Sequence, residues 1–103
     1  MIQISSRDNS VKLDVPFNAW KIQGDTHNEI VEFELESGQM IDFHPNPLDV
    51  IFFIVSGTGR ISLENGSYDV RKGDCAPVPG GIDRKWENTG SDTLHVLVIK
   101  QVK

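Results

Sequence analysis

Turn residues divide this chain into ten short runs of apolar or alternating sequence, and that division restricts the fold more than any other feature. None of the runs keeps a helical period over three turns. Many short strands at close, even spacing predict an antiparallel all-β sandwich or barrel. The predicted strands are 11–15, 19–23, 29–36, 39–44, 50–55, 59–64, 67–71, 75–78, 84–88 and 93–101.

Two of these regions carry a more specific prediction. In 29–36, apolar residues alternate with Glu32, Glu34 and Glu36, which predicts one buried face and one acidic face in solvent. Asn65-Gly66 lies between two alternating runs and is a strong hairpin signal, because both positions of a type I′ turn need positive φ.

The run Val50–Val55 is apolar at every position. A strand of this kind is covered on both faces. In a barrel the interior covers one face. The outer face is covered either by this chain or by another subunit, and the second option predicts a homodimer.

Composition restricts the class of protein. The chain has 103 residues with 38% hydrophobic content, which predicts one domain with one core. A net charge of −5 argues against nucleic-acid binding. No stretch approaches the roughly 18 apolar residues of a membrane span, and the first residues lack an apolar leader, so we expect no membrane partner and a cytoplasmic location. Cys75 is the lone cysteine, so an intrachain disulfide and a Cys-pair zinc site are excluded.

Two segments have spacings that resemble a known family. Residues 38–57 read G-x5-H-x-N-x3-V-x6-G, and residues 73–88 read G-x5-P-x-G-x2-R-x3-N. They resemble the two motifs of the cupin superfamily, G-x5-H-x-H-x3,4-E-x6-G and G-x5-P-x-G-x2-H-x3-N. The resemblance to small single-domain cupins of the cupin-2 type implies one domain over 1–103, folded as a double-stranded β-helix (cupin, jelly-roll) barrel.

The metal ligands of the family are degenerate here. In metal-binding cupins, two histidines and a glutamate of the first motif and a histidine of the second hold a divalent ion. The matching residues are His44, Asn46, Val50 and Arg84. Valine does not coordinate, and the permanent charge of an arginine repels a cation. We therefore expect no metal cofactor; the alternative is a divalent transition metal in a non-standard set that starts from His44.

The resemblance also implies which residues face the barrel interior. If His44 and Asn46 point inward, strand alternation places Met40 and Asp42 there too. The predicted ligand-binding residues are His44, Asn46, Arg84, Trp86, Asp42, Met40 and Phe52. A concave apolar site with a few polar groups is the usual form of a small-molecule pocket, and arginine suits a carboxylate or phosphate. This predicts a protein that binds a small anionic or sugar-like molecule in the lumen without the usual metal.

Other functions stay open at this point, and so does the question of whether the protein is an enzyme. One alternative is an isomerase- or epimerase-type cupin, with His44 as the base and Asp42 orienting it. Others are a metal-dependent dioxygenase with a non-standard ligand set, and an effector-binding or structural module of a larger assembly.

Several of these residues also have a purely structural interpretation, and for His44 it is a hydrogen-bonded remnant of an ancestral metal site. In the structural interpretation, we expect Arg84 to pair with Asp42 or Asp83, Trp86 to belong to the core, and Cys75 to be a small buried hydrophobic residue. The sequence does not determine which face His95 occupies.

Overall fold

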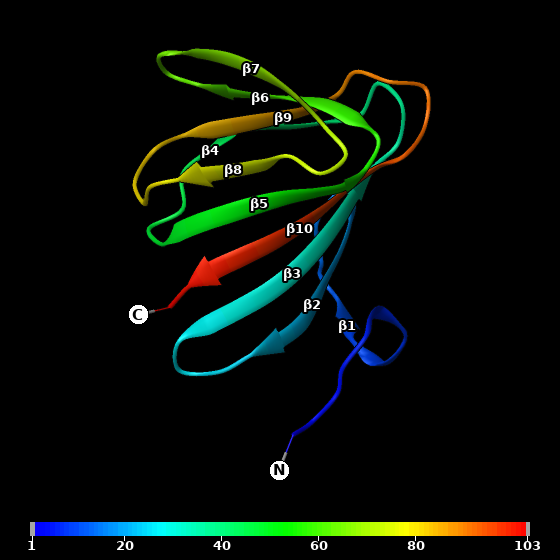
Figure 1. Ribbon diagram of the computed structural model, residues 1–103, viewed down its shortest axis with the longest axis vertical. Helices are drawn as coiled ribbons and strands as arrows, with labels where there is room; N and C mark the ends of the chain where they lie inside the picture. Colours follow the sequence, from blue (N-terminus) through cyan, green and yellow to red (C-terminus); the bar gives the residue numbers. More distant parts are fainter. Residues whose placement is uncertain (1, 103) are drawn as a thin grey trace.

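Two antiparallel sheets face each other across an apolar interior in the computed structural model, which describes residues 2–102 (Figure 1). The larger sheet has the strand order β1-β2-β3-β10-β5-β8, and the smaller has the order β4-β9-β6-β7. This confirms the predicted antiparallel double-stranded β-helix. The strands are β1 (Val11–Lys12), β2 (Asn18–Gly24), β3 (Asn28–Leu35), β4 (Met40–His44), β5 (Asp49–Ser56), β6 (Thr58–Leu63), β7 (Gly66–Arg71), β8 (Cys75–Val78), β9 (Arg84–Asn88) and β10 (Leu94–Gln101).

Each predicted run forms a strand, with ends that differ by a few residues. The β6–β7 hairpin lies where the Asn65-Gly66 signal predicted it. Its turn is centred one residue earlier, because Leu63 already pairs with Gly66. One short 3-10 helix, η1 (Arg7–Asn9), precedes β1. No helix within residues 2–102 is long and apolar enough to cross a membrane.

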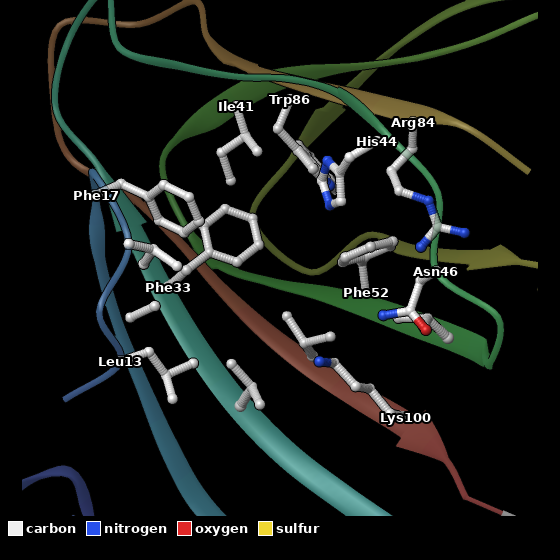
Figure 2. Close-up of a pocket in the computed structure, with 15 residues that line it drawn as sticks. Leu13, Phe17, Phe33, Ile41, His44, Asn46, Phe52, Arg84, Trp86 and Lys100 are labelled. Carbon is white, nitrogen blue, oxygen red and sulfur yellow. The ribbon is translucent and has the colours of Figure 1, made fainter. Parts of the chain in front are cut away.

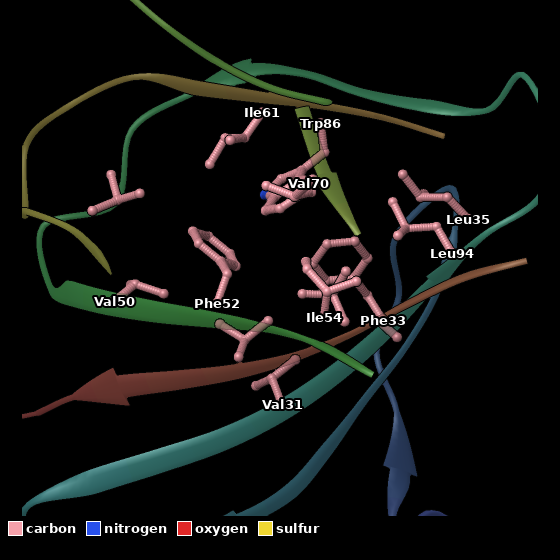
Figure 3. Close-up of a cluster of buried hydrophobic side chains, with 14 residues drawn as sticks. Val31, Phe33, Leu35, Val50, Phe52, Ile54, Ile61, Val70, Trp86 and Leu94 are labelled. Atoms are coloured by element: carbon pink, nitrogen blue, oxygen red, sulfur yellow. The ribbon is translucent and has the colours of Figure 1, made fainter. Parts of the chain in front are cut away.

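The core fills the space between the two sheets (Figure 3). Leu35, Ile54 and Leu94 are fully buried, because alternate residues of β3, β5 and β10 point inward. Burying one such side chain stabilises the fold by roughly 1.5–3 kcal/mol. Trp86 reaches in from β9 and packs edge-to-face on Phe52, with ring centroids 5.1 Å apart. The same alternation that builds the core therefore places Trp86 at its centre.

Gly57 forms the corner where the chain leaves the larger sheet at β5 and enters the smaller one at β6. Its φ is +90°, and a Cβ atom there would lie 2.6 Å from the Thr93 carbonyl oxygen. Glycine alone meets both conditions without strain. The first glycine-bounded segment, 38–57, therefore ends at a position that the fold requires.

The outer face of the larger sheet carries a charged cluster that the sequence did not predict. Arg7 pairs with Glu32 and Glu34, each at 2.9 Å, and its guanidinium stacks 4.1 Å from the centroid of the Trp20 ring. His95 also faces outward, with Nε2 2.7 Å from Glu32. We define the Arg7 clasp as Arg7, Trp20, Glu32, Glu34 and His95. Glu32 and Glu34 lie on the outward face as predicted, but the Arg7 clasp covers them in part, so they are less exposed to solvent than expected.

Two further expectations concern the outer surface of β5 and β8. Cys75 is exposed rather than buried, because Ala76 and Val78 are the residues of β8 that point inward. On β5, Ile51, Phe53 and Val55 face outward and are half-buried. Half-buried side chains fit cover by this chain as well as cover by a second subunit, so the homodimer stays a prediction.

Candidate functional site

A cavity of about 180 Å³ opens between the two sheets (Figure 2). Its walls are apolar and come from β2, β3, β5 and β10, with β4 and β9 opposite. Leu13 and Phe17, from the segment around β1, close one end, where Phe33 also lies. The polar lining residues gather toward the other end; they are His44, Asn46, Arg84 and Lys100.

Five of the seven predicted site residues line this cavity: His44, Asn46, Phe52, Arg84 and Trp86. Met40 and Asp42 do not, and the prediction that they face inward was wrong. Met40 is 49% exposed, and Asp42 is exposed as well.

The error has a local cause in β4. Ile41 pairs with Trp86 and His44 pairs with Arg84, so β4 advances three residues while β9 advances two. This irregularity shifts the alternation by one position. Ile41, rather than Met40 or Asp42, therefore lines the cavity.

Arg84 is the most unusual residue of the site, because it is a cation that is only 1% exposed. Its Nε donates to the Ile82 carbonyl at 2.9 Å, and Nη2 donates to the Pro79 carbonyl at 3.4 Å. No carboxylate oxygen within the described residues lies within 4.0 Å of the guanidinium. Pairing with Asp42 or Asp83, the structural interpretation of this residue, is therefore contradicted.

Burial has an electrostatic consequence for Arg84. Loss of solvent lowers the pKa of the guanidinium, and the nearby charge of Asp83 offsets this in part. An arginine keeps its proton at any pH a protein experiences. The folded protein therefore holds a buried positive charge that no carboxylate of the described residues contacts directly, although Asp83 lies near enough to stabilise it in part. Phe52 is the nearest aromatic partner, with its ring centroid 5.9 Å from Cζ.

His44 and Asn46 are each fixed by one hydrogen bond. Nδ1 of His44 lies 2.9 Å from the Asp42 carbonyl oxygen. A carbonyl only accepts, so Nδ1 is the protonated nitrogen and donates, and the lone pair of the neutral ring is on Nε2. Oδ1 of Asn46 accepts from the Leu48 N–H at 2.9 Å, which leaves the amide NH₂ as the unused end.

Lys100 and the closing residues Leu13 and Phe17 were missed by sequence reasoning. A signal for Lys100 was present: Leu94, Val96, Val98 and Lys100 alternate in β10, and the first three are buried. The Lys100 ammonium also lies 3.5 Å from Glu29. No comparable signal marked Leu13 or Phe17, since the path of the N-terminal segment depends on long-range packing.

The protein-family comparison decides the classification. The model described as "Cupin domain" matches residues 31–100, more than half of the chain. The chain belongs to the cupin family. The site described above therefore lies in the lumen of a cupin barrel.

Curated relatives match the chain only in part. An uncharacterized protein of Streptomyces coelicolor is 30% identical over 67 residues, 65% of this chain. The chain spans less than two thirds of the curated relatives it matches, 38% of one and 63% of the other.

Solved structures support the fold. An RmlC-like cupin of Methanocaldococcus jannaschii with a double-stranded β-helix fold has a TM-score of 0.80 at 22% identity, covering 98% of this chain and 91% of that one. A predicted oxalate decarboxylase of Thermotoga maritima has a TM-score of 0.85 at 14% identity, covering 98% and 100%. At these identities the likeness shows the fold alone.

The residues at the metal-ligand positions of this cupin do not fit a divalent ion. Oδ1 of Asn46 is engaged by a backbone N–H, Val50 has no donor atom, and Arg84 brings a positive charge. Within residues 2–102, no three His, Cys, Asp or Glu side chains come together as a possible metal site.

Proposed function

We propose that this cupin binds a small anion, most readily a carboxylate, in its lumen, with Arg84 as the anchor. The observation that carries the proposal is the buried guanidinium, which lines the cavity and has no carboxylate partner in the described part of the chain. A buried charge is costly unless it is paired. A carboxylate ligand supplies the missing partner, and the planar guanidinium matches its two oxygens.

The rest of the lining supports an anionic ligand. The polar lining residues carry nitrogen groups, two of them cationic, and no aspartate or glutamate among the described residues lines the cavity. Lys100 adds a second positive charge, partly neutralised by Glu29. The cavity has a volume of about 180 Å³, which suits a small molecule. The ligand is therefore short.

A second function, acid–base catalysis, is favoured by the geometry of His44. The Asp42 backbone carbonyl, rather than the Asp42 side chain, orients the ring and leaves the Nε2 lone pair free. That nitrogen is suited to accept a proton from a ligand held at Arg84. Incorporation of solvent deuterium into a bound carboxylate tests this: His44→Asn removes the base and is expected to abolish the exchange, and unchanged exchange rejects the role.

The binding proposal is tested by thermal shift on protein treated with a chelator. Short carboxylates are expected to raise the melting temperature, whereas neutral sugars of similar size are not. Arg84→Met is expected to abolish the shift. The matched control is Arg60→Met, which removes an arginine from an exposed pair with Asp69 and should keep it. Stabilisation by divalent metals alone, or an undiminished carboxylate shift in Arg84→Met, contradicts the proposal.

A further inference from the structure

The indole N–H of Trp86 is the starting point of this inference. Trp86 is 1% exposed and is wedged between Phe33 and Phe52, with ring centroids 5.8 and 5.1 Å away. Nε1 is the one buried side-chain nitrogen or oxygen within the described residues that has no hydrogen-bond partner. A buried donor without an acceptor destabilises a fold, so native proteins supply an acceptor in almost every case.

The indole nitrogen lies toward the polar end of the interior. Figure 3 shows it on the side of the ring nearer Val50 and away from Leu35 and Leu94. Val50, like Trp86, lines the cavity. The acceptor that Nε1 lacks is therefore expected on the side where Arg84 also lies.

At the polar end of the cavity, unused hydrogen-bond donors outnumber unused acceptors. Arg84 keeps N–H groups that its two backbone acceptors do not use, and Asn46 offers its amide NH₂. Trp86 adds its unpaired N–H. The acceptors of the polar lining are fewer: Nε2 of a neutral His44 has a free lone pair, and Oδ1 of Asn46 already accepts one hydrogen bond. A ligand that satisfies this end needs several acceptor oxygens and few donors.

Arg84 and Trp86 are two residues apart on the same face of β9, so their Cα atoms are separated by about 7 Å. Both line one small cavity. We propose that the ligand is a short carboxylate that carries a second acceptor oxygen, as in a 2-oxo acid, with its carboxylate on Arg84 and the second oxygen accepting from Trp86 Nε1–H. This inference rests on the proposed function and narrows its ligand class.

The competing explanation is an ordered water molecule that accepts from Nε1 whatever the ligand. The two explanations differ in one consequence. If the acceptor belongs to the ligand, removing one oxygen from the ligand weakens binding, and that difference depends on the indole N–H. If it belongs to water, the extra oxygen contributes nothing through Trp86.

The test compares 2-oxobutyrate with butyrate by isothermal titration calorimetry. The two have the same carbon skeleton and are both ionised at neutral pH. We expect the oxo acid to bind roughly tenfold more tightly, as one satisfied buried donor allows. Trp86→Phe should erase this difference while changing butyrate affinity less than threefold. Phe33→Leu is the matched control, because it removes aromatic volume beside Trp86 but no polar atom; it should keep the difference.

A second readout needs no substitution in the core. In ¹⁵N-labelled protein, 2-oxobutyrate should move the indole N–H resonance of Trp86 more than butyrate does, with Trp20 as an internal reference outside the cavity. Equal affinities, or equal Trp86 shifts, overturn this inference and leave carboxylate binding intact. Failure of both acids to bind refutes the proposed function itself.

Discussion

Replacement of Arg84 by methionine separates a ligand anchor from a structural residue, because the two roles predict opposite changes in stability. Arg84 is buried, and that burial lowers the pKa of its guanidinium. Two backbone carbonyls accept hydrogen bonds from it, and it forms no ion pair within the described residues. Methionine fills a similar volume without charge. Removing a member of a buried structural ion pair costs about 3–5 kcal/mol, whereas replacing an unpaired buried charge removes a desolvation penalty of several kcal/mol.

The hydrogen bonds lost in Arg84→Met oppose this gain in stability. Two bonds from a charged donor contribute about 1.5–3 kcal/mol each at best, and the bond to Pro79 is long at 3.4 Å. The two effects nearly cancel, so we expect ligand-free Arg84→Met to lie within about 1 kcal/mol of the parent protein, or above it. Carboxylate binding should fall at least 100-fold.

The assay is urea unfolding followed by tryptophan fluorescence, with and without a saturating short carboxylate. Arg60→Met is the control, since an exposed pair contributes about 0–1 kcal/mol. A loss of 3 kcal/mol or more in ligand-free Arg84→Met would show that the guanidinium is a structural element and not a ligand anchor. Retained carboxylate stabilisation in that variant would refute the anchoring role as well.

Three further predictions concern other parts of the fold. Burial raises the pKa of Glu32, but hydrogen bonds from Arg7 and His95 outweigh it, so the pKa lies below its ordinary value. The stability that the ionised carboxylate contributes is present above the ordinary pKa and is lost as the pH falls through the lowered one, and Glu32→Gln should flatten that part of an acid-unfolding curve. Gly57→Ala should cost about 2 kcal/mol or more in urea unfolding, against about 1 kcal/mol for Gly73→Ala, whose φ is similarly positive at +93° but whose added Cβ meets nothing within 4 Å. If the outer face of β5 forms a homodimer, Phe53→Arg should give monomers in light scattering, and a parent protein that is already monomeric contradicts the dimer.

Strand positions were predictable because two local signals agreed. Alternation identified the buried faces of β3 and β10, and glycine or proline separated one strand from the next. Gly57 illustrates the strength of this signal, since its positive φ and its contact with Thr93 both demand glycine. Local sequence carries such information because it is fixed by the backbone itself.

The site was predictable only in part, because its details depend on pairing between distant strands. The irregularity between Ile41 and His44 arises from the register of β4 on β9. No local sequence pattern predicted this irregularity, which turns Met40 and Asp42 outward. The Arg7 clasp likewise joins η1 to β3 and β10 across a long stretch of chain. Arg84 was identified from motif spacing, but only the packed structure shows that no carboxylate of residues 2–102 pairs with it.

The most direct test of the account is a crystal structure of the protein grown from a chelator-treated sample with millimolar 2-oxobutyrate. We expect a carboxylate in the lumen with both oxygens within hydrogen-bonding distance of the Arg84 guanidinium. A metal ion on His44, or a lumen closed by an acidic side chain of the protein on Arg84, would contradict it.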